Sequence, residues 1–238
     1  MFLKTAGTAS VVSGVVAAAA FDIAPVAEKA VAPPLSGTLF FNPQEAAIIQ
    51  AACERLIPHD DLGPGANEAG VPNYLDKQLA GAWGAGERLY RSGPWQVGTP
   101  SQGYQLPFTP AELFRNALRG IAADLKQQGK EFPALSDDEQ DAYLKALQAG
   151  GKDLNGVPAN VFFQTLLAMT VEGYFSDPAY GGNKDMLAWK MIGFPGAYAN
   201  YFDLVDKHGV KFTRAPLSIA DAPAVAHFHQ GPDIPAKL

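Results

Sequence analysis

Apolar residues recur at helical spacing along most of this chain, and several helix starts carry clear local signals. Three segments place Asn, Thr or Ser three residues before a glutamate, which is the arrangement of a capping box, and two of them add a proline at the first helical position. These segments are Asn42–Glu45, Thr109–Glu112 and Ser136–Glu139. The apolar periodicity after them predicts helices over residues 44–56, 110–128 and 137–148.

Further periodic segments complete a helical pattern. Residues 71–79 and 86–90 predict two shorter helices. Residues 157–175 predict a longer one, whose apolar side chains, Val171 and Phe175 among them, cover more than one face, so we expect it at the centre of the core. No run of four or more residues alternates as a strand would. The sequence therefore predicts an all-α protein: a single irregular helical domain of five to seven helices, with long Pro/Gly-rich loops and an extended C-terminal tail.

The glycine-rich stretch 181–196 stands apart from these segments. Its glycine pair frees the backbone for positive φ, Asp185 is placed to cap a short helix over residues 186–192, and Gly193 can end that helix. Two interpretations stay open for its Trp and Met side chains. Core packing is commoner for a lone aromatic residue at helical spacing, whereas Trp and Met are also enriched at the centres of protein interfaces.

The first residues differ from the rest of the chain. Residues 5–20 are small, apolar and uncharged, too few for a membrane span, and they suit the apolar region of an export signal. Residues 2–4 match the positions after the arginine pair of a twin-arginine signal. The arginines themselves are missing, so either translation starts upstream or export takes another route. We expect an export signal at 1–20, a flexible tether at 21–37, a helical domain at 38–206 and the tail at 207–238.

Composition narrows the function classes. Of the 238 residues, 47% are hydrophobic, and the formal net charge is −6. This balance argues for a folded body and against nucleic-acid binding, which requires a basic face. The single cysteine, Cys53, excludes an internal disulfide and any iron–sulfur or cysteine-rich zinc site supplied by this chain alone. Its apolar surroundings favour a buried thiol over a nucleophile.

Candidate metal-binding and catalytic residues are few. The acidic loop 59–68 offers oxygen ligands for calcium but lacks the EF-hand spacing, which favours a solvated turn. His227 and His229 are two residues apart, a spacing that favours surface histidines over a metal pair. The sequence contains no nucleophile elbow, zinc-binding helix motif, phosphate loop or flavin fingerprint. The residues therefore favour an accessory or binding protein over an enzyme that acts alone.

Four stretches carry a resemblance to a known family. They are Phe41–Glu45, Cys53–Pro58 with the acidic loop after it, Glu172–Pro178 and, most characteristic, Gly181–Gly196. Through them, residues 39–201 resemble the small subunit (subunit 3, or gamma) of the membrane-bound, flavin-dependent gluconate 2-dehydrogenase family.

The resemblance implies a non-catalytic subunit of a larger complex. In such a complex a large subunit holds FAD and oxidises the sugar acid, and a multihaem cytochrome c subunit carries electrons toward quinone. The small subunit binds the flavoprotein and aids its export. The resemblance further implies that this chain holds no cofactor or metal of its own. It places the chain in the periplasm, with membrane contact only through the complex.

We expect the flavoprotein interface to use the long loop 92–106 and the glycine-rich stretch. The expected contact residues are Trp95, Lys184, Met186, Trp189, Lys190 and Phe194. Two alternatives stay open. One is a stand-alone periplasmic enzyme or small-ligand-binding protein that uses the loop His59–Asp61. The other is the small subunit of a related ketogluconate, fructose or glucose dehydrogenase.

Overall fold

The computed structural model of the chain describes residues 35, 37–96, 98–102, 105–198, 202–210 and 214–221. By its contacts the chain divides into two units, residues 1–31 and 32–238, and every described residue belongs to the second. The expected export signal, nearly all of the expected tether, and the pair His227 and His229 lie outside the described residues. Those expectations stay predictions.

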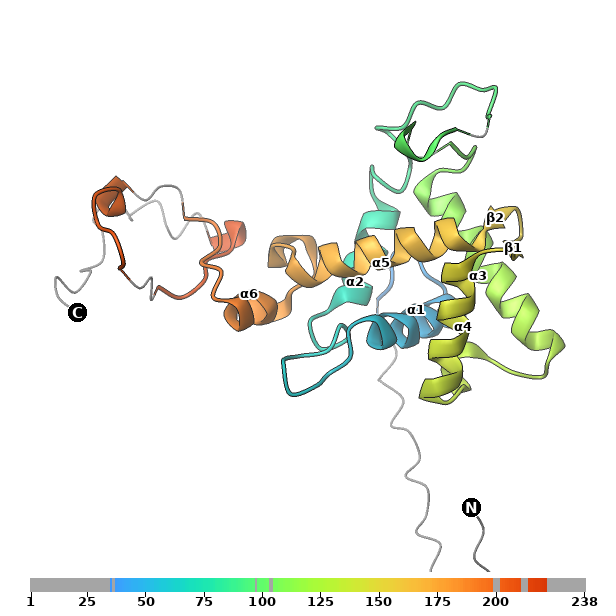
Figure 1. The fold of residues 1–238 in the computed structure, drawn as a ribbon, viewed down its shortest axis with the longest axis horizontal. Helices are drawn as coiled ribbons and strands as arrows, with labels where there is room; N and C mark the ends of the chain where they lie inside the picture. Colours follow the sequence, from blue (N-terminus) through green and yellow to red (C-terminus); the bar gives the residue numbers. More distant parts are fainter. Residues whose placement is uncertain are drawn as a thin grey trace, which may run out of the picture. The chain divides into compact units, whose positions relative to one another are not determined.

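Six α-helices and one small hairpin form the regular structure of the described residues (Figure 1). The helices are α1 (Pro43–Leu56), α2 (Val71–Ala80), α3 (Pro110–Gln127), α4 (Asp137–Ala149), α5 (Ala159–Phe175) and α6 (Leu187–Ile192). Short 3-10 turns lie between and after them: η1 (Pro100–Gln102), η2 (Phe132–Ala134), η3 (Pro178–Tyr180), η4 (Lys184–Met186), η5 (Phe202–Leu204) and η6 (Ile219–Asp221). The predicted number of helices is confirmed.

The three predicted capping boxes are present and set the starts of α1, α3 and α4. The side chains of Asn42, Thr109 and Ser136 each accept a hydrogen bond from the backbone N–H three residues on. The glutamate at that position accepts one from the N–H of the cap residue. Each box pairs two N–H groups that the first turn of a helix leaves without intrahelical partners. Because these signals are local, the predicted starts agree with the structure to within one residue.

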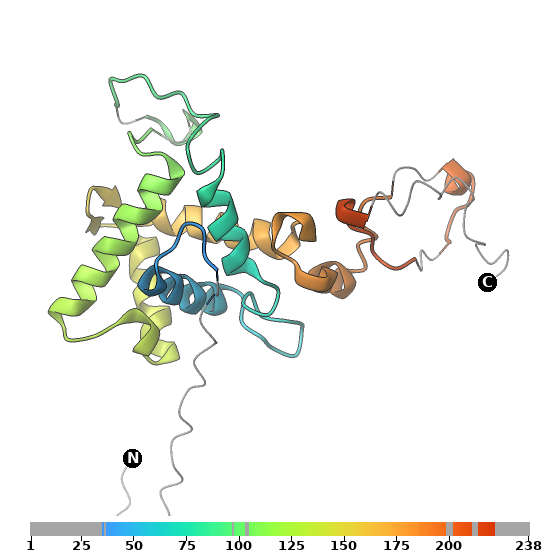
Figure 2. The same cartoon turned by 180° about the vertical axis from the view of Figure 1, so that it is seen from behind.

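Helix α5 lies at the centre of the core, as its apolar composition predicts. It packs against α1, α2, α3 and α4; Figure 1 shows α2 passing across it, and Figure 2 shows α1 between α2 and α4 from behind. Phe162 is fully buried and meets the ring of Phe114 edge to face, with 5.3 Å between centroids. Burying a side chain of this size contributes about 2–3 kcal/mol to the free energy of folding. The contacts of α5 therefore help to hold the four surrounding helices together.

The protein is not strictly all-α, because a short antiparallel hairpin precedes α5. Strand β1 (Asp153–Leu154) pairs with β2 (Val157–Pro158) around Asn155 and Gly156, whose φ angles are 56° and 89°. An Asn-Gly pair with positive φ at both positions is a preferred two-residue hairpin turn. Strands of two residues carry no readable alternation, and the sequence prediction therefore started the following helix two residues too early.

The segment after α2 is less regular than the sequence predicts. Residues 86–90, expected to be helical, form turns instead. Gly86 has a φ of 75°, which an α-helix does not accommodate. A Cβ at Gly84 would overlap the carbonyl group of Leu79, so only glycine lets the chain fold back on the end of α2. These glycines interrupt the helical pattern.

One buried carboxylate fixes the residues ahead of α1 to α2. Asp76 accepts hydrogen bonds from the backbone N–H groups of Leu39, Phe40 and Phe41, at 2.6, 3.0 and 2.9 Å. Asp76 is almost completely buried, so these donors replace the water that its carboxylate would otherwise bind. The sequence analysis missed this contact, because the partners are 35 to 37 residues apart in the chain.

Part of the C-terminal segment binds to the helical body. Leu217 exchanges backbone hydrogen bonds of 3.0 and 2.7 Å with the residues on either side of Gly196. The Asp177 carboxylate, just after α5, accepts a hydrogen bond from the Ser218 hydroxyl at 2.6 Å and another from the Ile219 N–H at 2.8 Å. The segment 214–221 is therefore joined both to the glycine-rich stretch and to the end of the central helix.

A polar group between α3 and α4 makes stability depend on pH. The pKa of Asp124 is lowered, first by a hydrogen bond from Lys152 Nζ (2.6 Å) and also by one from the Tyr143 hydroxyl (2.8 Å). A carboxyl group whose pKa falls on folding stabilises the protein above its unfolded pKa, and this contribution disappears as the pH falls through the folded pKa. We expect Asp124→Asn to lower the free energy of unfolding by about 1 kcal/mol at pH 7, and we expect this difference to shrink at about pH 3, below the ordinary pKa of an aspartate. Urea unfolding checks this, and an equal difference at both pH values would contradict it.

Candidate docking surface

The glycine-rich stretch 181–196 comes directly after η3 and folds back against α5. Gly181 has a φ of 98°, and a Cβ at Gly182 would overlap the carbonyl oxygen of Gly173, so a side chain at either position would force a rearrangement. Asn73 Nδ2 on α2 donates a hydrogen bond to Gly181 O at 2.7 Å. The start of the stretch is therefore a tight turn joined to both α2 and α5.

Asn183 holds this turn together from inside. Its side chain is fully buried, donates to Ser176 O and accepts from the Ala188 N–H, each at 2.9 Å. The prediction that Asp185 caps the short helix is wrong, because Asp185 lies within η4 and α6 begins two residues later. Asn183 already binds the N–H that a capping side chain would take, since Ala188 is the second residue of α6. Gly193 ends α6 in the left-handed conformation, as predicted.

Trp189 packs into the interior of this stretch. It is only 5% exposed, its Nε1–H donates to Phe175 O at 2.8 Å, and its ring meets Phe194 edge to face with 5.1 Å between centroids. Of the two interpretations of the stretch, core packing therefore holds for this side chain. A Trp that bonds the last carbonyl group of α5 also stiffens the surface around it.

The other residues expected at an interface lie in two separate places. Lys184, Lys190 and Phe194 are exposed, and Met186 is half-buried, all within the glycine-rich stretch. Trp95 instead lines a depression of about 320 Å³ formed by residues of the segment 89–108, and none of the other expected contact residues lines it. Contact of these residues with a partner stays a prediction.

A larger apolar depression lies between α2 and the last turns of α5. It has a volume of about 500 Å³ and is lined by Tyr74, Gln78, Val171, Glu172, Phe175, Ser176, Asp177 and Tyr180. Val171, Phe175 and Tyr180 are 44%, 39% and 52% exposed. The apolar residues of the predicted central helix are therefore not all buried, since Val171 and Phe175 lie outside the core. Their spacing of four residues places them on one face of α5, and that face is outside the core.

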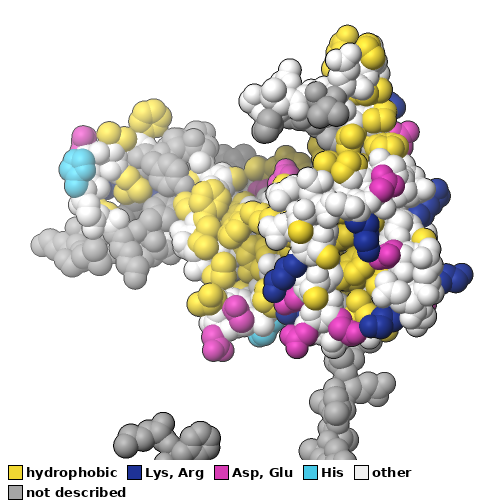
Figure 3. All heavy atoms as spheres, turned by 45° about the vertical axis from the view of Figure 1, so that its right-hand side comes forward, with side chains coloured by type: hydrophobic (Ala, Val, Ile, Leu, Met, Phe, Trp, Pro, Cys, Tyr) yellow, Lys and Arg dark blue, Asp and Glu magenta, His cyan; other side chains and the backbone are white. Residues whose placement is uncertain are grey.

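A second depression adjoins the first. It has a volume of about 370 Å³, is lined by Gln78, Ala82, Trp83, Glu87 and Arg88, and shares Gln78 with the larger one. Figure 3 shows one face of the molecule, on which hydrophobic side chains gather at the surface of the helical part. Contiguous apolar surface of this kind in a folded protein marks interaction sites more often than isolated exposed residues do.

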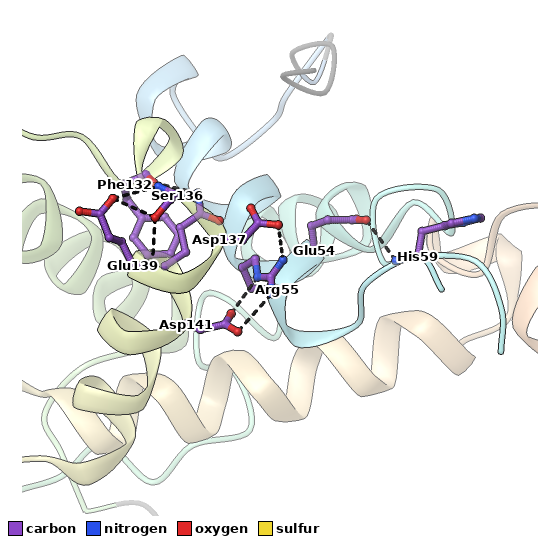
Figure 4. A network of polar contacts seen from close by, with 9 residues as sticks. Glu54, Arg55, His59, Phe132, Ser136, Asp137, Glu139 and Asp141 are labelled. Atoms are coloured by element: carbon purple, nitrogen blue, oxygen red, sulfur yellow. Dashed lines mark hydrogen bonds and ion pairs between the residues drawn. The ribbon is translucent and has the colours of Figure 1, made fainter. Parts of the chain in front are cut away.

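Side chains of the stretch Cys53–Pro58 connect α1 to α4 and to the acidic loop (Figure 4). Arg55 on α1 binds Asp141 on α4 through two hydrogen bonds of 2.7 and 3.1 Å, and Asp137 through one of 2.7 Å. The hydrogen bond to Asp141 is the first cause that raises the pKa of Arg55. Glu54 accepts from the backbone N–H groups of His59 and Asn67, at 3.3 and 3.2 Å, and so closes the acidic loop.

The acidic loop itself forms a turn. Asp60 accepts a hydrogen bond from the Leu62 N–H at 2.8 Å, and His59 Nδ1 lies 3.0 Å from the Glu68 carboxylate. Across the described part of the chain, no three His, Cys, Asp or Glu side chains are grouped so that they could hold a metal ion. His59 and Glu68 therefore bind each other, and Asp60 binds the loop backbone, whereas the buried Oδ1 of Asn67 has no hydrogen-bond partner among the described residues.

Cys53 is a structural thiol. It is fully buried in α1, 3.6 Å from the Thr170 hydroxyl of α5, and burial raises its pKa to about 12. Because the thiolate is the reactive form, we expect almost no reaction with a thiol reagent at pH 8 in the native protein. One equivalent should react in denaturant. Fast labelling of the native chain would contradict the buried position.

The fold and this surface define an α-helical protein that exposes apolar side chains around a tight glycine-rich turn. Within the described residues, no helix has both the length and the apolar composition needed to cross a bilayer. A comparison with protein families matches residues 43–196 to the family described as gluconate 2-dehydrogenase subunit 3. The match covers more than half of the 238 residues, and the chain belongs to this family. No curated protein and no solved structure gave a significant match.

Proposed function

We propose that this chain is the non-catalytic small subunit of a membrane-associated, FAD-dependent dehydrogenase complex of the gluconate 2-dehydrogenase type. Its role is to bind and stabilise the FAD-containing large subunit and to aid its export. The observation that carries the proposal is the family match over residues 43–196, which includes the whole of the glycine-rich stretch. In this complex the chemistry belongs to the large subunit, and a multihaem cytochrome c subunit passes the electrons on toward quinone.

Two features of the chain support a role in binding another protein. Val171, Phe175 and Tyr180 expose apolar surface at the end of the central helix. The Asn183 and Trp189 hydrogen bonds fix the backbone beside them, so a partner meets a surface that is already ordered and loses less conformational entropy on binding.

The proposed location is the periplasmic side of the cytoplasmic membrane, with membrane contact through the other subunits. The proposed interface residues in the glycine-rich stretch are Lys184, Met186, Lys190 and Phe194, with Trp95 from the separate segment. The substrate of the complex is set by the large subunit, and related ketogluconate, fructose and glucose dehydrogenases fit the same role for this chain.

Co-expression with a large flavoprotein subunit of this dehydrogenase type tests the proposal. With an affinity tag on this chain, the eluate should contain the flavoprotein with its flavin absorbance and should oxidise gluconate or a related sugar with a dye as electron acceptor. The tagged chain alone should show neither flavin absorbance nor oxidation. A flavoprotein that accumulates equally well without this chain and never co-purifies with it would contradict the proposal, as would dye reduction by the isolated chain.

The alternative of a stand-alone enzyme or ligand-binding protein centred on His59–Asp61 gains no support from the geometry. Asp60 accepts backbone hydrogen bonds of its own turn, and His59 is paired with Glu68 at the surface. His59 and Asp60 therefore already have partners within the loop.

A further inference from the structure

The exposed face of α5 carries Asn160 and Gln164 in its first turns and becomes largely apolar over its last two turns. Glu172 is the only charged residue among its 17 residues. On the exposed face, Ala168, Val171 and Phe175 lie at spacings of three and four residues and so form one continuous strip. A surface helix normally carries polar residues on this face, so this strip has the character of a helix surface that another polypeptide covers.

The neighbours of this strip turn it into a groove. Tyr74 and Gln78 of α2 form one wall of the larger depression, and Tyr180 of η3 lies at its end. Gln78 also lines the adjoining depression, whose other lining residues follow the end of α2, so the groove continues past that end. Two adjacent depressions beside one helix provide room for several successive side chains of a bound segment.

The part of the groove beside α5 is lined by the carboxylates of Glu172 and Asp177 and, within the described part of the chain, by no cation. Glu172 is exposed, and among the described residues it forms no ion pair. Its interaction within the chain is a hydrogen bond with the Tyr74 hydroxyl, which donates to the carboxylate and whose pKa is raised mainly by burial. The C-terminal end of α5, three residues further on, adds the negative end of the helix dipole. A basic side chain in the bound segment would therefore meet a carboxylate that no cation of the described chain neutralises.

The segment 214–221 does not cover this groove. It binds Asp177 and the backbone around Gly196, and none of its residues lines either depression. The described part of the chain thus leaves the groove open beside the ordered turn of the glycine-rich stretch.

We propose that the groove between α2 and α5 is the docking site for a segment of the FAD-containing subunit. That segment presents apolar side chains to Val171 and Phe175 and a basic side chain to Glu172. This inference rests on the proposed function. It adds the surface of this chain that binds the flavoprotein and the chemistry of the partner segment. The residues of this surface differ from the interface residues expected from the sequence.

Cysteine footprinting of the full chain tests the location. The native Cys53 is buried and should not react, so a single introduced cysteine reports its own site. Val171→Cys should lose at least about tenfold in its rate of maleimide labelling when the flavoprotein is added, because the centre of an interface excludes the reagent. Leu39→Cys is the matched control: its backbone bonds Asp76 on the opposite side of α2, and its rate should not change.

Substitutions test the chemistry. Val171→Asp and Phe175→Glu should each weaken binding of the flavoprotein by at least about tenfold. Glu172→Gln, which keeps an acceptor for Tyr74, should weaken it less, and Glu172→Lys should weaken it more than Glu172→Gln. Leu39→Asp places the same charge on another exposed apolar residue and should leave binding unchanged. Thermal unfolding of each free variant shows that it is folded.

The outcomes separate the inference from the function on which it rests. If the wild-type chain does not bind the flavoprotein at all, the proposed function fails. If the wild-type chain binds the flavoprotein, but Val171→Asp and Phe175→Glu bind it with the same affinity as Leu39→Asp, the inference is overturned and the proposed function stands. Two further results would also overturn it. A dimer of this chain that Phe175→Glu dissociates would mean that a second copy occupies the groove. Protection of Val171→Cys without the flavoprotein, lost when residues 222–238 are removed, would mean that those residues occupy it.

Discussion

Gly182→Ala is expected to lower the free energy of unfolding by more than about 3 kcal/mol, or to prevent folding. The new Cβ would overlap the carbonyl oxygen of Gly173 and lie 2.7 Å from the Ser176 hydroxyl. The carbonyl group belongs to the backbone of α5 and cannot rotate away as a flexible side chain can. The overlap could be relieved only if the glycine-rich turn moved away from α5, which would break the hydrogen bonds of Asn183.

Gly129→Ala is the matched control for this experiment. Gly129 has a φ of 68°, and no heavy atom lies within 4 Å of an added Cβ. The substitution adds the same methyl group with backbone strain alone, which costs about 1–2 kcal/mol. Urea unfolding followed by circular dichroism measures both variants. A loss for Gly182→Ala no larger than that for Gly129→Ala would mean that the Gly173 carbonyl shifts at a cost of only about 1–2 kcal/mol, contrary to its close packing against Gly182.

Asp76→Ala is expected to cost about 3 kcal/mol or more, because it leaves the N–H groups of Leu39, Phe40 and Phe41 without their acceptor. Asp76→Asn separates the contributions of the hydrogen bonds to the two carboxylate oxygens. Its single amide oxygen can keep the bonds to Phe40 and Phe41, which both reach Oδ1, and loses the bond of Leu39 to Oδ2. We therefore expect a loss of about 1–2 kcal/mol for this variant.

Hydrogen exchange locates the effect of these two substitutions. In Asp76→Ala the amides of Leu39, Phe40 and Phe41 should all exchange faster, and in Asp76→Asn chiefly that of Leu39. Equal stability of Asp76→Ala and the wild type would show that water replaces the carboxylate without penalty, which its almost complete burial argues against.

The sequence predicts the helix starts best, because their signals are local. Each capping box spans four residues, and the interaction it encodes is made within those four residues. The central position of α5 is predicted almost as well, since a helix with one charged residue in 17 must be largely buried. The Asn155-Gly156 hairpin is missed because its strands are too short to show a period.

Contacts between distant segments are out of reach of the same reasoning. Asp76 looks like an ordinary polar residue of α2 until the chain ahead of α1 lies across it. Asn183 is similar: its left-handed φ of 43° and its two side-chain hydrogen bonds depend on Ser176 and Ala188 being brought together. Asp185 looks like the better cap in the sequence because local pattern alone cannot show that Asn183 is already in place.

The candidate surface is predicted in part. The glycine-rich stretch, singled out as the most characteristic piece of the family, lies within the family match, but its Trp189 is interior. Val171 and Phe175, two of the apolar residues of the predicted central helix, are exposed. A helix that is apolar on all sides gives no periodic signal to separate the face inside the core from the face outside it.

The pairing of Leu217 with the backbone around Gly196 determines where this protein can be shortened. The family match stops at residue 196, yet the polypeptide returns to that point about twenty residues later. A fragment cut at 196 would leave the Asp177 carboxylate with the Ala179 N–H as its only donor among the described residues. Recombinant fragments meant to keep the end of the central helix in its native surroundings should therefore extend at least to Asp221.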